Sequence, residues 1–103
     1  MDVLIVIKRL VMAGKLVITE KAQVEMLLDN LTEMDVIEAI VYSPRISKKI
    51  MSTSIHKENP GDRLYIIIGK TLSGKIIYTK GRVGRYANER VFYVLISSKR
   101  SMR

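Results

Sequence analysis

The stretch Arg90–Ser98, RVFYVLISS, decides the fold class of this chain. Its centre, Val91–Ile96, is an unbroken apolar and aromatic run, which is typical of a strand covered on both sides. We therefore expect a central strand packed under helices. Upstream, Arg63–Thr71 and Lys75–Arg82 are rich in Ile and Tyr and predict two further strands. A tight turn at Ser73-Gly74 joins them.

Farther from this strand region, the first forty residues have the spacing of helices. The expected apolar stripes are Leu4, Ile7 and Val11, then Val24, Leu27, Leu28 and Leu31, then Val36, Ile37, Ile40 and Val41. Thr19 is the expected N-cap of the second helix, which continues to about residue 30. Thr32 and Asp35 form a capping arrangement for the third. Pro44 ends that helix, because the residue before a proline disfavours helical angles.

Length and charge place the strands and helices in one basic domain. The chain has 103 residues, no cysteine, one histidine and a net charge of +8. Residues 1–40 carry four basic and seven acidic side chains, whereas residues 41–103 carry fourteen basic and three acidic ones. We expect an α+β domain over residues 1–103, in which two to three helices (1–43) pack on a twisted antiparallel sheet (44–103). The composition excludes disulfide and thiolate chemistry and, with a lone histidine, argues against a metal site.

Short apolar runs also bear on localisation. The longest near the N-terminus, Val3–Ile7, follows Asp2 and precedes Lys8-Arg9, which is the reverse of a secretory signal. A membrane-spanning helix needs about 20 apolar residues. The expectation is a cytoplasmic protein that does not contact a membrane.

Three motifs have ordinary structural alternatives. Gly69–Lys75 matches part of a phosphate-binding loop, but Ile76 and the β-branched residues after it predict a hairpin turn instead. Gly81–Gly84 matches a GxxG clamp but predicts a flexible glycine turn, and Gly84–Asn88 predicts a loop. His56 is either a solvated loop histidine or a general acid or base.

The basic, tyrosine-bearing second half is the strongest functional signal. Side chains alternate along a strand, so Tyr78, Lys80 and Arg82 should project together, and by the same parity Tyr93 and Lys99 should share a face. Tyrosine rings can stack on unpaired bases while Lys and Arg neutralise phosphates. The alternative is an ordinary solvated sheet with core tyrosines. The charge favours nucleic-acid binding.

Four segments together resemble MqsR-type toxins, which are small endoribonucleases of toxin–antitoxin systems. The segments are Ile7–Thr19, Lys48–Thr53, Ser73–Lys80 and Leu95–Lys99. The resemblance implies a RelE-like fold, cleavage of single-stranded mRNA without a metal ion or small-molecule cofactor, and an antitoxin protein as partner.

Carried onto this sequence, the resemblance implicates Lys49, Tyr78 and Lys99 as catalytic residues. Tyr78 would move a proton and the lysines would offset charge as a 2′-hydroxyl attacks phosphorus. The expected RNA-contacting residues are Arg63, Tyr65, Lys80, Arg82, Arg85 and Tyr93. The family's active-site glutamine has no clear counterpart, and Arg63 or Tyr65 lies nearest in the sequence.

Three functions therefore remain open on the sequence alone. The first is an endoribonuclease toxin, which should cut RNA in the presence of chelator. The second is a noncatalytic RNA- or DNA-binding module, which should bind in a salt-sensitive way without cutting. The third is an interaction domain whose positive surface docks an acidic protein segment.

Overall fold

The computed structural model of the protein describes residues 2–51, 63–86 and 89–101. Its elements are α1 (Val3–Met12), β1 (Leu16–Ile18), α2 (Glu20–Leu28), α3 (Glu33–Val41), β2 (Lys48–Met51), β3 (Arg63–Lys70), β4 (Ile76–Tyr86) and β5 (Glu89–Arg100). The protein is α+β, with the helices in the N-terminal half and most of the sheet in the C-terminal half. His56, the turn residues 59–62 and the end of the strand expected over 48–54 lie outside the described residues.

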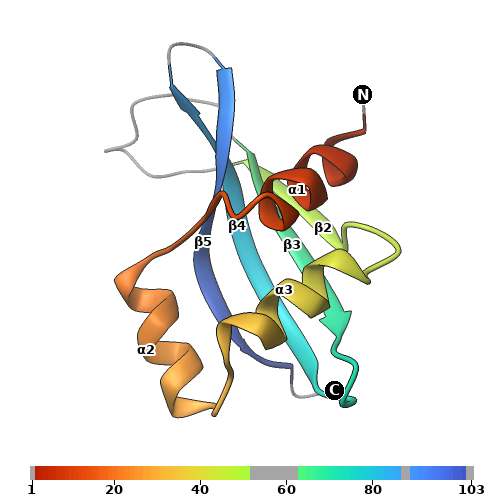
Figure 1. The fold of residues 1–103 in the computed structure, drawn as a ribbon, viewed down its shortest axis with the longest axis vertical. Helices are drawn as coiled ribbons and strands as arrows, with labels where there is room; N and C mark the ends of the chain where they lie inside the picture. Colours follow the sequence, from red (N-terminus) through yellow and green to blue (C-terminus); the bar gives the residue numbers. More distant parts are fainter. Residues whose placement is uncertain (1, 52–62, 87–88, 102–103) are drawn as a thin grey trace.

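The five strands form one mixed sheet in the order β1-β5-β4-β3-β2 (Figure 1). β2, β3, β4 and β5 are antiparallel neighbours, as expected, but β1 runs parallel to β5. β1 is an unexpected three-residue strand inside the half that was predicted to be helical. It follows α1 closely and is held by the Tyr93 amide donating to Lys15 O at 2.9 Å and the Thr19 amide donating to Leu95 O at 3.1 Å.

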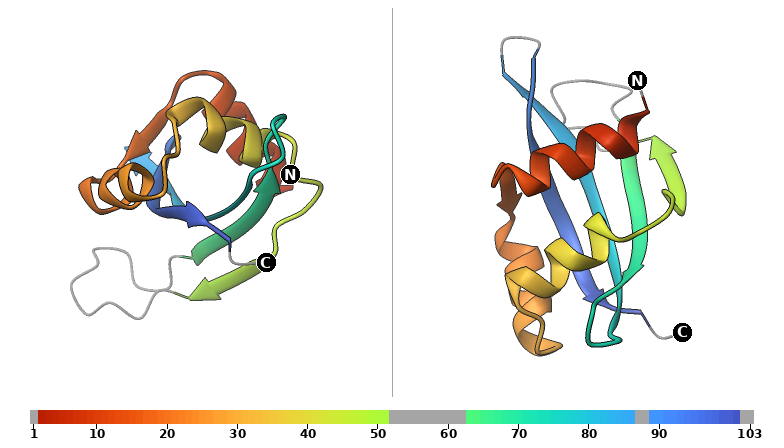
Figure 2. Two further views of the ribbon diagram at one scale, coloured as in Figure 1. Left: turned by 90° about the horizontal axis from the view of Figure 1, so that it is seen from below. Right: turned by 45° about the vertical axis from the view of Figure 1, so that its right-hand side comes forward.

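All three helices lie on one side of the sheet (Figure 2). α3 packs across β3 and β4, α1 packs against α3 and β5, and α2 packs against β5. The opposite face carries no helix of the described residues. We call it the open face.

The helix boundaries follow the capping residues expected from the sequence. The Thr19 hydroxyl accepts a hydrogen bond from the Ala22 amide at 3.3 Å at the start of α2. Thr32 and Asp35 form a complete capping box at the start of α3, each side chain accepting from the other residue's amide. Local capping is therefore enough to begin both helices.

Three of the four residues of the apolar stripe expected on the second helix do not face the core, whereas the fourth, Leu31, lies after the end of α2 and is buried. Val24, Leu27 and Leu28 are 52, 79 and 78% exposed, whereas the buried residues of this helix are Ala22 and Met26. α2 has apolar residues on two sides, so helical periodicity alone does not select the side that packs. The side that carries Ala22 and Met26 packs on the sheet, and the side that carries Val24, Leu27 and Leu28 is left on the surface.

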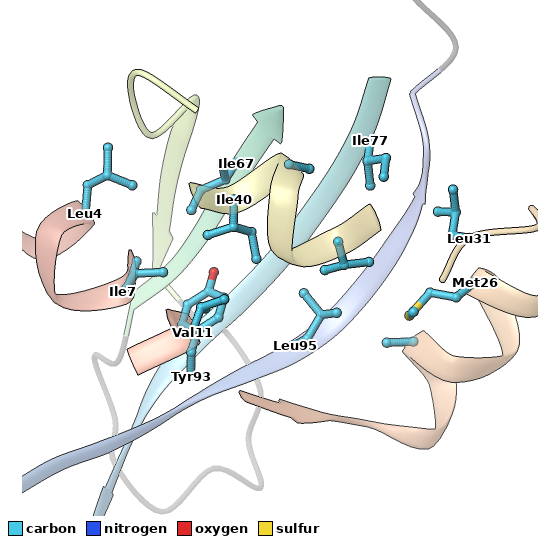
Figure 3. Packing of buried hydrophobic residues seen from close by; sticks show 13 residues of the cluster. Leu4, Ile7, Val11, Met26, Leu31, Ile40, Ile67, Ile77, Tyr93 and Leu95 are labelled. Carbon is cyan, nitrogen blue, oxygen red and sulfur yellow. The ribbon is translucent and has the colours of Figure 1, made fainter. Parts of the chain in front are cut away.

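The core lies between the helices and the covered face of the sheet (Figure 3). Leu4, Ile7 and Val11 of α1 are buried, as expected, and the ring of Tyr93 lies among Ile7, Val11 and Ile40. α3 approaches the sheet closely at Gly69, where an added Cβ would lie 1.8 Å from Ala39 O. The absence of a side chain at Gly69 thus sets the distance between α3 and β3.

β4 and β5 extend beyond the strands expected over residues 75–82 and 90–98. β4 continues through Gly81 and Gly84 to Tyr86, so the glycine turn and the start of the expected 84–88 loop are strand instead. The connection at Ser73-Gly74 is a tight turn, as expected, with Gly74 at a φ of 97°. The hairpin interpretation of Gly69–Lys75 is confirmed, because β3 and β4 pair on either side of it.

Candidate nucleic-acid interface

Charge is segregated between the helices and the sheet. Strands β2–β5 carry ten Lys and Arg residues and one acidic residue, Glu89, at the start of β5. The acidic residues of the chain lie mostly in and around α2 and α3. A polyanion would therefore meet cations along the strands.

The acidic side chains of α2 and α3 bind backbone and side-chain donors of the sheet and its turns. Glu25 accepts from the Ser97 hydroxyl at 2.7 Å and the Ser98 amide at 3.0 Å, and Asp29 accepts from the Arg100 amide at 2.7 Å. Partial burial alone would raise the pKa of Glu25, but the hydrogen bonds from Ser97, Ser98 and Lys21 outweigh it and lower the pKa. These carboxylates thus have structural roles along the edge of β5, where Glu25 binds Ser97, the register partner of Lys80.

A second acidic anchor lies at the turn between β3 and β4. Asp35 pairs with Lys75 at 2.9 Å, and Glu38 accepts from the Leu72 amide at 3.0 Å. The amide of Thr32, followed by the Lys75 ammonium, lowers the pKa of Asp35. Both contacts hold α3 to the turn.

The composition of the open face follows from strand alternation. On β4, Ile77 and Thr79 are fully buried under the helices, so the residues between and after them point the other way. Strand register then assigns the neighbours on each adjoining strand. The open-face residues are Lys48 and Ile50 of β2, Leu64, Ile66, Ile68 and Lys70 of β3, Ile76, Tyr78, Lys80, Arg82 and Gly84 of β4, and Phe92, Val94, Ser97 and Lys99 of β5.

Tyr78 and Lys99 are direct neighbours on this face. They are partners in the β4–β5 register, and Lys99 Nζ lies 5.7 Å from the centroid of the Tyr78 ring, within cation–π range. Lys80 and Arg82 follow Tyr78 on the same face and are half-buried. The expectation that these three β4 side chains project together agrees with the strand assignment.

Lys49 does not join Tyr78 and Lys99. Its register partner is Tyr65, which shares the covered face with Ile67, and it lies at the sheet edge in a hollow of about 250 Å³ with Asp2 and Arg45. Strand alternation therefore places Lys49 on the opposite face from the other two expected catalytic residues. The three side chains implied by the family resemblance do not converge on one reacting phosphate in this structure.

Tyr93 is inside the core, contrary to the role expected for it. Its side chain is 0% exposed, its hydroxyl has no hydrogen-bond partner among the described residues, and burial raises its pKa far above the usual value. Tyr93 and Lys99 do not share a face as expected, because a β-bulge between Lys80 and Gly81 shifts the β4–β5 register and interrupts the alternation of side chains along β5. Lys99 consequently lies on the open face and Tyr93 on the covered one, so Tyr93 cannot stack on a base.

The remaining expected RNA contacts are spread over both faces. Arg63 and Tyr65 alternate with open-face residues on β3 and belong to the covered side, where Tyr65 packs against the core and Arg63 is exposed. Arg85 is exposed near the far end of β4. Of the nine site residues expected from the sequence, the open face brings together Tyr78, Lys80, Arg82 and Lys99.

The two glycines of β4 each lie beside an aromatic ring of β5. A Cβ at Gly81 would meet the Tyr93 ring at 2.6 Å on the covered face, and one at Gly84 would meet the Phe92 ring at 3.0 Å on the open face. Aromatic side chains that cover strand glycines stabilise sheets. The Gly81–Gly84 motif is therefore a packing arrangement within a strand.

Phe92 is an open-face residue that the sequence pattern did not predict. It is 39% exposed, although it lies within the apolar run expected to be covered on both sides. Exposed Lys48 and Lys70 also border this face. Side-chain alternation along β5 places Phe92 on the open face once one buried residue of the strand is known. The apolar segment Val91–Ile96 contains no polar residue that would mark the open side in the sequence.

No protein-family model, curated protein or solved structure matches the chain. None of the described helices is long and apolar enough to cross a bilayer. In the described part of the chain, His, Asp and Glu side chains form no group of three that could hold a metal ion.

Proposed function

We propose that the protein is a nucleic-acid-binding module that uses the open face of its sheet. The single observation that carries this proposal is the alignment of Tyr78, Lys80, Arg82 and Lys99 on a sheet face without a helix or an acidic neighbour in the described strands there. Cations at strand spacing can neutralise successive phosphates, and an aromatic ring on the sheet surface offers a platform for a base.

Two features support binding rather than cleavage. Lys49, which the family resemblance implies is catalytic, lies across the sheet from Tyr78 and Lys99. The active-site glutamine of that family also has no clear counterpart in the sequence. A RelE-like toxin that cuts mRNA and is held by an antitoxin is the alternative that the resemblance implies.

The test compares two double variants that remove the same charge. Lys80→Gln with Arg82→Gln changes the open face, whereas Arg9→Gln with Lys21→Gln changes exposed positions on the helices. Binding of a labelled RNA is measured by fluorescence anisotropy over a range of salt concentrations. For single strands, the slope of log K against log salt should fall in magnitude by about 0.7 for each phosphate that is no longer neutralised.

We expect the open-face variant to bind RNA more weakly, with the slope of log K against log salt reduced in magnitude by about 1.4. The helix variant should bind as the wild type does. Equal weakening in both variants, or no binding by the wild type, would refute the proposal. Incubating the same RNA in chelator and mapping its ends tests the alternative. Discrete cuts that disappear in Tyr78→Phe would support the endoribonuclease.

A further inference from the structure

Two aromatic residues, the half-buried Tyr78 and the exposed Phe92, lie at opposite ends of a cationic track on the open face. Tyr78 is near the start of β4, and Phe92 of β5 is the register partner of Gly84 near its other end. Lys80 and Arg82 lie between them on the same face. Residues two apart on a strand are about 6.7 Å apart, so the track from Tyr78 to Gly84 is about 20 Å long.

The Phe92 end of the track depends on a glycine. A Cβ at Gly84 would lie 3.0 Å from Phe92 Cδ2 and 3.2 Å from Val94 Cγ2, so any larger residue would crowd the ring. With glycine there, the ring packs beside the β4 backbone and still leaves the side chain 39% exposed. The Phe92 ring therefore presents an aromatic surface on the open face on which an unpaired base could stack.

The Tyr78 end has a different arrangement. The Lys99 ammonium lies over the Tyr78 ring at 5.7 Å. A base that stacks on this ring takes the place of the ammonium over it, and the displaced Lys99 side chain can then pair with the adjoining phosphate. Both ends therefore offer an aromatic ring, and the interval between them offers Lys80 and Arg82.

We propose that the open face binds single-stranded rather than double-stranded nucleic acid, with one base on Tyr78, one on Phe92, and the connecting phosphates on Lys80 and Arg82. This inference rests on the proposed function. The faces of paired bases are hidden within a duplex, whereas unpaired bases can stack on aromatic side chains. A basic surface used only for phosphates would show no such preference.

The chain has no tryptophan, so a single introduced indole reports on one position. Phe92→Trp places it on the track, and Leu27→Trp places it on α2, where the native side chain is 79% exposed. Oligouridylate, oligothymidylate and a duplex of matched length are then titrated into each variant. Single strands should quench the emission of the Phe92→Trp variant, the duplex should not, and the Leu27→Trp variant should change with neither.

Affinity measurements on ring-retaining and ring-removing pairs complete the test. Tyr78→Leu and Phe92→Leu should each weaken single-strand binding by roughly 5- to 150-fold, and Tyr78→Phe and Phe92→Tyr, which keep a ring, should bind more tightly than the leucine variants. Thermal unfolding of each variant identifies any that does not fold. If a leucine variant does not fold, the titration of the Phe92→Trp variant tests base stacking in its place.

The outcomes separate this inference from the proposed function. If the leucine variants bind normally and a duplex binds as well as a single strand, while Lys80→Gln with Arg82→Gln still weakens binding, the stacking inference is wrong and the binding function stands. If none of the open-face variants changes binding, both are wrong. A preference for oligouridylate over oligodeoxyuridylate, which differ only in the sugar 2′-hydroxyl, would indicate that this hydroxyl is also recognised.

Discussion

Replacing Gly69 with alanine should destabilise the protein more than its small size suggests. The added Cβ would lie 1.8 Å from the carbonyl oxygen of Ala39, where ordinary contact begins at 3.4 Å, so α3 would have to move by about 1.6 Å. The Cβ is fixed directly to the backbone and the oxygen is part of it, so neither atom can rotate away. Overpacking typically costs about 1–3 kcal/mol, and this contact belongs at or above the upper end.

The expected effect is a large part of the total stability. A domain of this length has a free energy of unfolding of about 5–15 kcal/mol. A loss of about 3 kcal/mol would lower Tm by roughly 12–24 °C, since each kcal/mol corresponds to about 4–8 °C. Circular dichroism during heating measures this directly. The backbone at Gly69 is not in the left-handed region, so crowding accounts for the whole loss.

Gly14→Ala is the matched control. Gly14 has a φ of 78°, but a Cβ added to it would have no atom within 4 Å, so its replacement costs only backbone strain of about 1–2 kcal/mol. Ala39→Gly should not rescue Gly69→Ala, because the atom met is the carbonyl oxygen, which glycine retains. A Gly69→Ala protein that melts within a few degrees of the wild type, or above Gly14→Ala, would show that α3 and β3 accommodate the added Cβ without strain.

Three further predictions concern stability. Met26→Asp should lower the free energy of unfolding by about 3 kcal/mol or more, because it buries a charge. Leu27→Asp, at a position that is 79% exposed, should change it by about 0.5 kcal/mol or less. Urea denaturation compares the two variants, and equal losses of stability would place Leu27 in the core. Tyr93→Phe removes a buried hydroxyl that has no partner among the described residues, so the midpoint in urea should stay the same or rise, with RNA affinity unchanged; weaker RNA binding by a stable variant would contradict the burial of Tyr93. In the folded protein the Thr32 amide, followed by the Lys75 ammonium, lowers the pKa of Asp35. The ionised Asp35 carboxylate therefore stabilises the fold fully above its unfolded pKa of about 3.9, and this stabilisation is lost as pH falls through its folded pKa. The wild type should therefore lose more stability than Asp35→Asn between about pH 6 and about pH 3, and parallel losses in urea midpoints would show that the Asp35 contacts contribute nothing.

Sequence reasoning succeeded where the relevant interaction is local. The Thr19 cap and the Thr32–Asp35 capping box depend on residues three apart and form as expected. The turn at Gly74 is also specified by its own residues. In each case the signal and the structure involve the same few positions.

It failed where a distant segment makes the choice. The side of α2 that packs is selected by β5, which lies some seventy residues along the chain at Ser97 and Ser98. The face occupied by Tyr93 depends on a bulge at Lys80/Gly81, which no residue of β5 reveals. The family resemblance groups Lys49 with Tyr78, and the sheet register separates them. Such features require the paired strands to be known.

The carboxylates of α2 have a consequence for self-association. β1 pairs with only Tyr93–Leu95, which leaves the next amides of β5 facing outward from the sheet. Glu25 and Asp29 accept the hydrogen bonds of Ser98 and Arg100, in positions that a strand from another molecule would otherwise fill. A second copy would have to displace α2 before it could extend the sheet there. The helix thus keeps a strongly β-forming segment from templating aggregates.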